Sequence, residues 1–292
     1  MLLSVVIPIG NLEKNLDNIK NIALSSCKLN IEMVFVLDTS EISALEELTK
    51  LCKSWNLDNF KIIECNGRNP GSSRNLGMLS CTGDWVFFCD SDDMPCLTVI
   101  TRAIIDLNHE IDILIGSYAV KENSAEIQAN SIIESNTNKS WLDIALNPGL
   151  WRWVIKRNFI LTESFPNVSM GEDQYFLLTL LNREPKIKLC DEVFYHYVKN
   201  SKDSLTFSKS KINDLIHIIN LENKFNIFSD KYSNFKRHVM LRQIITLMRY
   251  GSLKGRSQAI YYFIVSIFKQ SPIETIDSIK FAIHILKNKI KS

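Results

Sequence analysis

The chain has 292 residues, of which 46% are hydrophobic and 23% are charged, a composition typical of one large globular domain or a domain with an appendage. This composition excludes a disordered tail, a collagen and a small disulfide-bonded scaffold. The seven cysteines are an odd number without CxxC or other metal-ligand spacing, which indicates a reduced, cytoplasmic protein with buried thiols and argues against a zinc site.

The charge is unevenly distributed along the chain. Residues 231–292 carry twelve Lys/Arg and two Asp/Glu, a net charge of +10, whereas residues 1–230 carry −8. An acidic body with a basic tail favours an anionic surface as a partner rather than nucleic acid. The longest uncharged runs, 1–12 and 257–268, are too short to span a membrane, and the first contains Pro8 and lacks a basic flank, so it is not expected to be a secretion signal.

The first 120 residues predict an α/β fold. Short, almost continuously apolar runs alternate with segments of helical periodicity, and in chain order the runs read LLSVVIP, EMVFVL, FKIIE, DWVFFC and IDILIG. Such runs are typical of strands that helices cover on both faces, so we expect a mostly parallel sheet. Ligands of such sheets bind beyond the carboxyl ends of the strands. The residues that follow the runs are polar, small or acidic, at 8–11, 38–40, 66–73 and 90–93.

Three carboxylates directly follow the apolar run that ends at Cys89. Asp90, Asp92 and Asp93 would repel one another at this strand end, and a divalent cation would offset the repulsion. Oxygen ligands of this kind suit Mg²⁺ or Mn²⁺, which keep water ligands and bridge to substrate phosphates. The alternative is a solvated turn that happens to be acidic.

The segment 66–77, NGRNPGSSRNLG, has the features of an anion site. It combines a flexible backbone, the guanidinium groups of Arg68 and Arg74, and a predicted helix start near Ser72. Phosphate and metal sites at neighbouring strand ends indicate a nucleoside diphosphate as ligand. The sequence has neither the GxxxxGK[ST] of a P-loop nor a GxGxxG after the first strand, so those two nucleotide-binding folds are not expected.

The rest of the chain predicts an irregular excursion and then helices. Residues 121–139 are rich in Asn, Ser and Glu, which indicates a loop or edge strand, and only helical patterns follow Ser208. Ser271 to Glu274 form a capping box with proline in the first turn. The terminal helix that follows has one apolar face, made by Ile273, Ile276, Ile279, Ile283, Leu286 and Ile290.

A second apolar segment, residues 259–268, lies between basic residues. It is too short to span a membrane and is flanked by Lys254, Arg256 and Lys269. We interpret it as an interfacial helix that docks reversibly on anionic lipid. The alternatives are a helical subdomain whose lysines are simply solvated, and packing of the terminal isoleucine face on the catalytic body.

Four segments follow one another in the order and spacing of known motifs: SVVIP, VFVLDTS, GSSRNLGMLSCTGDWVFFCDSDD and MGEDQ. Together with FYHYVKNSKDSLT they cover residues 3–206 and resemble family 2 glycosyltransferases with the GT-A fold. The resemblance implies a GT-A catalytic domain at residues 1–207 with a mostly parallel sheet, followed by a basic helical C-terminal region at residues 208–292.

The resemblance also implies an activity. The expected enzyme is inverting and metal-dependent, and moves a hexose or N-acetylhexosamine from a nucleotide-diphosphate sugar, by default a UDP-sugar. The implied acceptor is a hydroxyl of a glycan or lipid-linked glycan in bacterial surface-polysaccharide synthesis, and the implied cofactor is Mn²⁺ or Mg²⁺. We expect a cytoplasmic enzyme that can lie peripherally at the inner face of the cell membrane.

The family pattern implies roles for individual residues of the donor site. The DSD at 90–92 resembles the DxD motif, which implies Asp92 as metal ligand and Asp90 as a ligand near the ribose or sugar, with Asp93 supporting the turn. Asp38 falls on the second acid of the family's DDGS stretch, which implies contact with the nucleotide base. The implied donor-binding residues are Pro8, Asn11, Asp38, Arg68, Arg74, Asn75, Asp90 and Ser91.

The sequence departs from the family pattern at two positions next to these residues. Leu37 replaces the first acid of the DDGS stretch, and Gly10 stands where the family commonly has an aromatic residue before Asn11. Both changes concern the surroundings of the nucleotide base, so the nucleotide is less firmly implied than the fold.

The pair Glu172-Asp173 resembles the family's ED motif, whose aspartate is the implied general base. A carboxylate in a preorganised cleft can take the proton of the acceptor hydroxyl, while a metal offsets charge on the leaving diphosphate. One base, one metal and no positioned nucleophile fit a single displacement with inversion. The same two residues can also cap the apolar helix predicted at 175–181, and the two roles are compatible.

Two further residues are implied near the site. Trp151 resembles the family's tryptophan segment ahead of the base and is expected to line the acceptor side, whereas Trp153 is expected to be packing. His196 lies where related sequences turn back over the donor, so it is a candidate ligand of the metal or the diphosphate. A hydrogen-bonded structural histidine is the alternative for His196.

Two other classes of protein stay open at the level of the sequence. One is a catalytically inactive GT-A module that binds nucleotide or membrane, and the other is a nucleotidyltransferase, which would release pyrophosphate rather than a nucleoside diphosphate. The intact DSD at 90–92 and Glu172-Asp173 favour the active glycosyltransferase over both.

Overall fold

The computed structural model describes residues 2–38, 43–108, 110–122, 132–136, 141–199, 209–224, 230–268 and 270–288. The chain divides into two compact units. The first consists of residues 1–139, 149–167 and 185–202, and the second of residues 140–148, 168–184 and 203–292. Thr39 and Ser40, most of the predicted 121–139 excursion and the end of the family-like FYHYVKNSKDSLT stretch lie outside the described residues.

These units differ from the predicted boundary between residues 207 and 208. The chain enters the second unit for the last time at residue 203, close to the prediction, but two earlier segments, 140–148 and 168–184, also belong to it. Both segments carry helices that contact the C-terminal helices. A boundary drawn along the sequence could not anticipate that helices from the middle of the chain would share a core with its last third.

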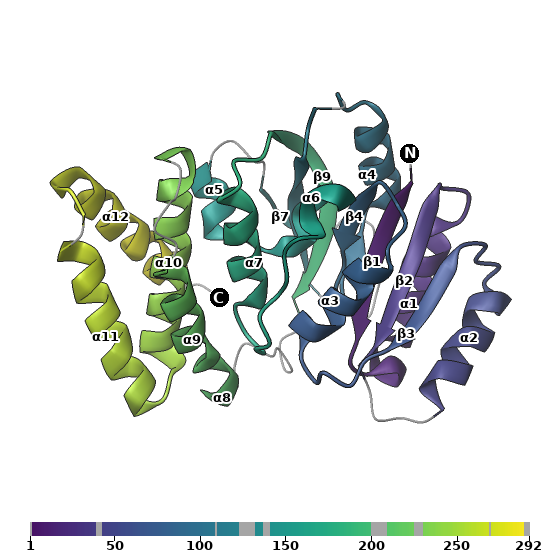
Figure 1. Ribbon diagram of the computed structural model, residues 1–292, viewed down its shortest axis with the longest axis horizontal. Coiled ribbons are helices and arrows are strands. Elements are labelled where there is room, and N and C mark those ends of the chain that lie inside the picture. Colours follow the sequence, from purple (N-terminus) through teal and green to yellow (C-terminus); the bar gives the residue numbers. More distant parts are fainter. Residues whose placement is uncertain are drawn as a thin grey trace. The chain divides into compact units, whose positions relative to one another are not determined.

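A mixed sheet organises the first unit (Figure 1). In the described part of the chain it has nine strands in the order β3-β2-β1-β4-β8-β6-β9-β5, with β7 paired to β6. Strands β1 to β4 are parallel, and β8 is antiparallel to both β4 and β6. The strands are β1 (Leu3–Ile9), β2 (Ile31–Leu37), β3 (Phe60–Glu64), β4 (Trp85–Phe88), β5 (Met94–Pro95), β6 (Ile113–Glu122), β7 (Ile132–Asn136), β8 (Trp153–Lys156) and β9 (Ile187–Lys199).

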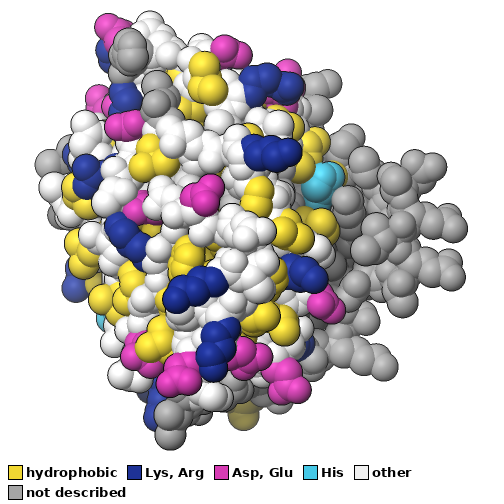
Figure 2. Space-filling view, turned by 90° about the vertical axis from the view of Figure 1, so that its right-hand side faces the viewer, with side chains coloured by type: hydrophobic (Ala, Val, Ile, Leu, Met, Phe, Trp, Pro, Cys, Tyr) yellow, Lys and Arg dark blue, Asp and Glu magenta, His cyan; other side chains and the backbone are white. Residues whose placement is uncertain are grey.

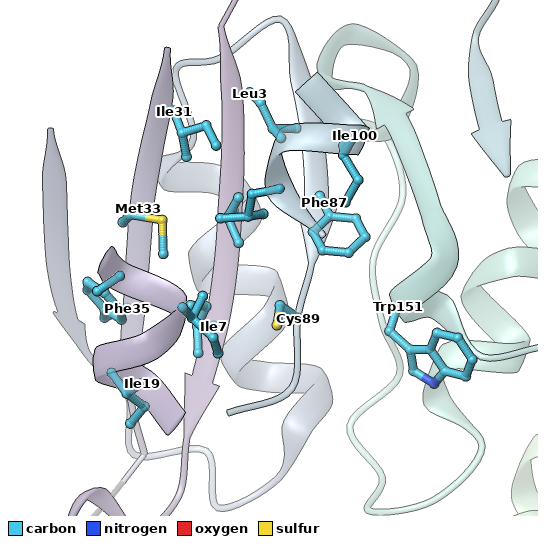
Figure 3. Packing of buried hydrophobic residues seen from close by; sticks show 14 of the residues in the cluster. Leu3, Ile7, Ile19, Ile31, Met33, Phe35, Phe87, Cys89, Ile100 and Trp151 are labelled. Carbon is cyan, nitrogen blue, oxygen red and sulfur yellow. The ribbon is translucent and has the colours of Figure 1, made fainter. Parts of the chain in front are cut away.

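Helices cover both faces of the parallel strands, as the continuous apolar runs predict. On one face, Ile7 of β1 and Phe35 of β2 share a core with Ile19 and Ile100 from two helices (Figure 3). On the other face α3 lies so near the sheet that a Cβ at Gly77 would stand 2.3 Å from Val6 Cγ1. The helical segments of this unit are α1 (Leu12–Ser26), α2 (Ala44–Ser54), α3 (Pro70–Ser80), α4 (Leu97–Ile105), η1 (Leu150–Arg152) and α6 (Arg157–Ile160).

The second unit is helical in its described residues. Trp141 of α5 packs edge to face on Tyr232 and Phe235 of α10, at ring-centroid distances of 5.0 and 5.6 Å. The predicted capping box is confirmed, because Ser271 N donates to Glu274 Oε2 at 2.9 Å and Glu274 N donates to Ser271 Oγ at 3.4 Å. The helices are α5 (Trp141–Leu146), α7 (Glu172–Leu181), α8 (Lys209–Ile212), α9 (Asp214–Glu222), α10 (Asp230–Tyr250), α11 (Leu253–Phe268) and α12 (Pro272–Asn288).

The isoleucine face of α12 is not its buried face. Phe281 and Ile285 are 3% and 5% exposed, whereas Ile273 and Ile276 are 81% and 54% exposed. Because α12 contacts α10 through the Phe281 side, its isoleucine face is left open to solvent. Within the second unit this face is therefore not the one that packs on α10, and packing of the face on the catalytic body stays a prediction; Ile290 lies outside the described residues.

On the face of the first unit shown in Figure 2, basic and acidic side chains are mixed. On the side that carries α2, Lys/Arg and Asp/Glu side chains are interspersed, with hydrophobic atoms between them (Figure 2). No helix among the described residues is both long enough and apolar enough to cross a membrane.

A buried carboxylate ties the amino ends of the parallel strands together. Glu32, 1% exposed, accepts hydrogen bonds from Lys61 Nζ at 2.8 Å, from Thr82 N and Oγ1, each at 2.8 Å, and from Ser4 Oγ. Burial raises the pKa of Glu32, but these donors outweigh burial and lower it to about 2. Glu32 therefore stabilises the fold as an ion and lies at the opposite end of the strands from the predicted site.

We expect Glu32→Gln to lower the free energy of unfolding by about 2–3 kcal/mol at neutral pH. Because the folded-state pKa is depressed from 4.5 to about 2, the stabilisation by Glu32 is present above the unfolded value and is lost as the pH falls toward the folded value. Urea unfolding of both proteins at neutral pH and near pH 3 measures this difference. The exposed Glu46→Gln is the matched control, and an equal difference at both pH values would contradict the assignment.

Candidate functional site

The three carboxylates that follow β4 form a tight turn whose anchor is Tyr195 of β9. The Tyr195 hydroxyl donates to Asp93 Oδ2 at 3.0 Å and accepts from Asp90 N at 3.2 Å. Tyr195 is fully buried and Asp93 is 3% exposed, so this contact lies beneath the turn. The predicted role of Asp93 in supporting the turn agrees with this geometry.

Helix α1 holds the same turn from another side. Asn15 Nδ2 donates to Ser91 Oγ at 2.8 Å, and Asn18 Nδ2 lies 3.4 Å from Ser91 O and 3.3 Å from Asp93 O. Asn11, the cap of this helix, accepts from Lys14 N at 2.8 Å. Ser91 is thus 7% exposed and is positioned by side chains that the sequence did not single out.

The charges of the turn are only partly compensated by the protein. Arg74, 8% exposed, places Nη2 2.9 Å from Asp90 Oδ1. Asp92 is the exposed carboxylate of the turn. Desolvation by surrounding atoms and then the charge of Asp90 raise the pKa of Asp92, against the opposing charge of Lys14. A cation next to Asp92 would relieve this repulsion.

The donor set of the turn fits a Mg²⁺ or Mn²⁺ ion held jointly with a substrate phosphate. Among the described residues no group of three His, Cys, Asp or Glu side chains converges into a complete metal site. Mg²⁺ is commonly bound by one or two carboxylates together with water and substrate phosphates, rather than by a full protein cage. Asp92 and its neighbour Asp90 meet that smaller requirement.

Asp38, at the end of β2, anchors the loop that precedes α3. Its two oxygens accept hydrogen bonds from Arg68 N at 2.9 Å, Asn69 N at 3.0 Å and Ser73 Oγ at 3.2 Å. Arg68 has a φ of +53°, a conformation that a non-glycine residue adopts at a cost, and these bonds hold it there. Contact of Asp38 with a nucleotide base stays a prediction.

Helix α3 begins at Pro70, two residues before the predicted start. Asn69 caps it and accepts from Ser72 N at 2.9 Å, so that N–H of the first turn is already bound within the protein. Asn75 exchanges two hydrogen bonds with the backbone of Phe165, at 2.9 and 2.8 Å. The structure therefore gives Asn75 an anchoring contact, while the Arg68 side chain is exposed. Their binding to a donor stays a prediction.

The remaining residues predicted in the first unit lie in different settings. Pro8 is in β1, paired in register with Val36 of β2, and is half-buried. His196 follows Tyr195 in β9, pairs in register with Met94 and is half-buried. Because neighbouring residues of a strand point to opposite faces, His196 faces away from the side on which Tyr195 holds the acidic turn. Its ligand role is therefore not supported by this placement and stays a prediction.

Trp151 is part of an aromatic cluster rather than an open platform. It is 8% exposed and stacks on Tyr195 with centroids 4.7 Å apart and an interplanar angle of 16°. It also packs edge to face on Tyr118 at 5.1 Å. Trp151 thus supports the tyrosine that anchors the acidic turn, and contact with an acceptor stays a prediction. Trp153 is fully buried, which confirms its predicted packing role.

The candidate base belongs to the second unit. Helix α7 begins at Glu172, after Gly171, whose φ of +84° and nearby Leu215 side chain favour glycine. Glu172 is 5% exposed, and Asp173 is half-buried and accepts from Gln174 N at 2.8 Å. Both carboxylates lie in the first turn, where the helix dipole favours negative charge. The structure confirms that a helix begins at this pair, whereas capping by the two side chains and the role of Asp173 as base stay predictions.

Little in the sequence marked the residues that support the turn. Tyr195, Asn15 and Asn18 are far from Asp90 along the chain and meet it only in the folded sheet. The FYHY stretch of the family-like end contained Tyr195. Nothing comparable marked the two asparagines, apart from their positions one turn apart on the first helix.

Comparisons with known proteins identify the family of the chain. Residues 4–152 match the family model "Glycosyl transferase family 2". The poly(ribitol-phosphate) beta-N-acetylglucosaminyltransferase TarP of Staphylococcus aureus is 27% identical over 275 residues, which are 86% of this chain and 81% of that protein. TarS of the same species, with the same enzyme name, is 26% identical over 230 residues, which are 76% of this chain and 40% of that longer protein.

Solved structures agree on the fold. Residues 1–349 of S. aureus TarS in complex with UDP-GlcNAc give a TM-score of 0.66 at 17% identity, covering 95% of this chain and 89% of that chain. The mannosyltransferase PcManGT from Pyrobaculum calidifontis, in complex with GDP-Man and Mn²⁺, gives 0.59 at 12% identity, covering 99% and 86%. These likenesses, together with the family match, confirm the predicted GT-A fold class. With about half of its length matched by the family model, the chain belongs to glycosyl transferase family 2 and is a glycosyltransferase.

Proposed function

We propose that this glycosyltransferase moves a hexose or N-acetylhexosamine from a UDP-sugar to a hydroxyl of a surface glycan or lipid-linked glycan, with inversion at the anomeric carbon. The observation that carries the proposal is the acidic turn after β4, fixed by Tyr195 and two α1 asparagines and paired with Arg74. Relatives named as poly(ribitol-phosphate) N-acetylglucosaminyl- and glucosyltransferases, and TarS solved with UDP-GlcNAc, support this donor class.

The proposed roles follow from the chemistry of each side chain. Asp92 and Asp90 would hold Mn²⁺ or Mg²⁺, which when bound neutralises charge on the leaving diphosphate. Asp173 takes the proton of the acceptor hydroxyl as the new bond to the anomeric carbon forms and the bond to the diphosphate oxygen breaks. PcManGT was solved with Mn²⁺, which supports a metal in a related fold.

A donor panel tests the proposal. The purified protein is incubated with Mn²⁺ and, separately, UDP-GlcNAc, UDP-glucose, UDP-galactose and GDP-mannose, with and without a polyol-phosphate or glycan acceptor. We expect release of UDP from one UDP-sugar, increased by an acceptor. Release of pyrophosphate would indicate a nucleotidyltransferase instead, and UDP binding without any release would indicate an inactive module.

The anchor of the acidic turn gives a further expected result. Tyr195→Phe removes the hydroxyl that contacts both Asp93 and Asp90, so we expect UDP affinity in the presence of Mn²⁺ to fall about five- to tenfold, as for one lost buried hydrogen bond. Calorimetric titration with UDP and Mn²⁺ measures the change. Tyr197→Phe, two residues along β9 and 37% exposed, is the matched control. Equal affinities of all three proteins would mean that the turn does not depend on Tyr195.

We also propose that α11 and α12 dock reversibly on anionic membrane lipid. Several of their large apolar side chains are exposed, and the exposed cations Lys254, Arg256, Lys280 and Lys287 lie on the same two helices. The acidic residues Glu274 and Asp277 bind Arg237, at 2.7 and 3.0 Å, and so are already compensated. The exposed apolar residues are Leu253, Ile260, Tyr261, Ile264, Phe268, Ile273, Ile276, Ile279, Ile283 and Leu286.

Flotation with lipid vesicles tests the docking. At low salt the full chain should float with vesicles that contain phosphatidylglycerol and not with pure phosphatidylcholine. The double variant Lys280→Gln/Lys287→Gln should bind about 30-fold more weakly, at about 1 kcal/mol per lysine. The control Lys50→Gln/Lys53→Gln changes two exposed lysines of α2. Absence of flotation at low salt, or concentration-dependent self-association in its place, would overturn the lipid assignment.

A further inference from the structure

A buried hydrogen-bond network of the second unit joins α7 to α9 and α10, which lie beside one another in Figure 1. Gln243 of α10, 2% exposed, donates from Nε2 to Gln174 Oε1 at 3.0 Å and to Glu222 Oε1 at 2.9 Å. Glu222 is the last residue of α9 and is fully buried. Gln174 directly follows Asp173 and donates its backbone N–H to Asp173 Oδ1. The network therefore ends beside the proposed base.

Two more atoms of this network are buried acceptors. Glu222 Oε2 and Gln243 Oε1 form no hydrogen bond with any described residue. While Glu222 is ionised, both oxygens can only accept hydrogen bonds, so they cannot bond to each other. Each buried acceptor without a donor destabilises the fold by about 1–3 kcal/mol. A proton on Glu222 Oε2 gives both oxygens a hydrogen-bond partner. The protonated Oε2 can then donate to Gln243 Oε1, while Glu222 Oε1 accepts from Gln243 Nε2.

The charges around Glu222 favour the same protonated state. Burial raises the pKa of Glu222 to about 8, opposed by the Gln243 hydrogen bond and the charge of Lys236 on α10, and assisted by the charge of Asp173 on α7. The helices α8 and α11, which also contact α9, add no charged group to this shift among the described residues. Ionisation of Glu222 would place a second negative charge near Asp173, with the neutral Gln243 amide donating to Oε1 and no described residue donating to Oε2.

We propose that Glu222 is a positioning residue for Asp173: it is held as a neutral acid, forms an acid–amide pair with Gln243 and thereby fixes the first turn of α7. The inference rests on the proposed role of Asp173 as the base. When Glu222 loses its proton, the pair opens, Gln174 loses a fixed partner and the base gains a like-charged neighbour. Turnover then declines at alkaline pH through a group that does not touch the substrate.

Three variants of the full chain test the positioning role. Glu222→Leu and Gln243→Leu should lower kcat by about tenfold or more, as expected for a displaced catalytic group, with the KM for the donor unchanged. Glu222→Gln should restore most of that loss, because two primary amides form the same pair of hydrogen bonds. It should also remove the alkaline decline of kcat, whose midpoint in the unmodified enzyme is expected near pH 8. Thr246→Val, one turn further along α10, is the matched control for folding.

Two readouts do not depend on turnover. In the infrared difference between the unmodified protein and Glu222→Gln, we expect the carbonyl band of a protonated carboxyl group at neutral pH, disappearing at alkaline pH. Amide hydrogen exchange in the first turn of α7 should be faster in Glu222→Leu and Gln243→Leu than in Glu222→Gln.

Each outcome bears on a different part of the inference. If the carboxyl band is absent at neutral pH, Glu222 is ionised and the inference is overturned. If the band is present but the leucine variants leave kcat and α7 exchange unchanged, Glu222 is protonated without positioning anything, which also overturns it. If the unmodified enzyme transfers no sugar, the proposed function fails instead, and the band and the exchange still decide whether the acid–amide pair fixes α7.

Discussion

Asp173→Asn is expected to reduce kcat by on the order of 10²-fold or more, the usual cost of losing a positioned general base. Asparagine has nearly the same size and can still accept the hydrogen bond from Gln174 N, so α7 should begin at the same place. It cannot take up a proton at neutral pH. Since the acidic turn and Arg74 belong to the first unit, the UDP affinity should stay close to that of the unmodified enzyme.

Turnover with saturating donor and acceptor, together with calorimetric UDP titration, separates these two effects. Glu172→Gln is the informative companion because Glu172 is the neighbouring carboxylate of the same turn and is 5% exposed. Asp106→Asn, an exposed residue after α4, controls for the change from carboxylate to amide. Normal turnover in Asp173→Asn with a large loss in Glu172→Gln would move the base to Glu172.

Asp92→Ala is expected to abolish the increase in UDP affinity that Mn²⁺ causes, a loss on the order of tenfold to 10²-fold in metal affinity or more. The three carboxylates of the turn differ in their partners: Asp90 pairs with Arg74, Asp93 accepts from the Tyr195 hydroxyl, and Asp92 is exposed. Asp92 is thus the carboxylate placed to meet a cation from solvent. The other two cannot replace it without giving up contacts that hold the turn.

Calorimetric titration of UDP with and without Mn²⁺ measures the effect in both proteins. Asp58→Ala, at an exposed position before β3, is the matched control for the loss of one surface carboxylate. An unchanged affinity and an unchanged Mn²⁺ dependence in Asp92→Ala would contradict the metal assignment. A loss of affinity that is equally large without Mn²⁺ would point to direct contact between Asp92 and the nucleotide.

Local sequence patterns predicted the parallel half of the sheet because its strands are buried on both faces. In β1, β2 and β4 every residue is buried or half-buried. A short, continuously apolar run of this kind is typical of a strand covered on both faces. The strands β8 and β9 were missed. Their pairing depends on contacts between distant segments, and a sequence of four residues such as WVIK carries no period that could distinguish strand from helix.

The candidate site was predictable in its motifs and not in its supports. The DSD and ED segments have family spacing, so Asp92 and Asp173 could be named from the order of residues alone. That Asp38 uses both oxygens to hold the α3 loop, and that Trp151 stacks on Tyr195, follows from tertiary packing. Which side chains hold a functional group in place depends on contacts between residues far apart in the chain, and these contacts cannot be predicted from the order of residues in one sequence.

The interleaving of the two units bears on how the chain is made. Helices α5 and α7 leave the ribosome before α9 to α12, yet their apolar faces are buried on those later helices. During synthesis the side chains of Trp141 and of the buried leucines of α7 are therefore exposed to solvent until the last third of the chain has emerged from the ribosome. In a chain truncated near residue 208, these apolar side chains would stay exposed to solvent. The C-terminal helices thus cover the apolar side of the segment that carries Asp173, and a chain without them exposes apolar surface that promotes aggregation.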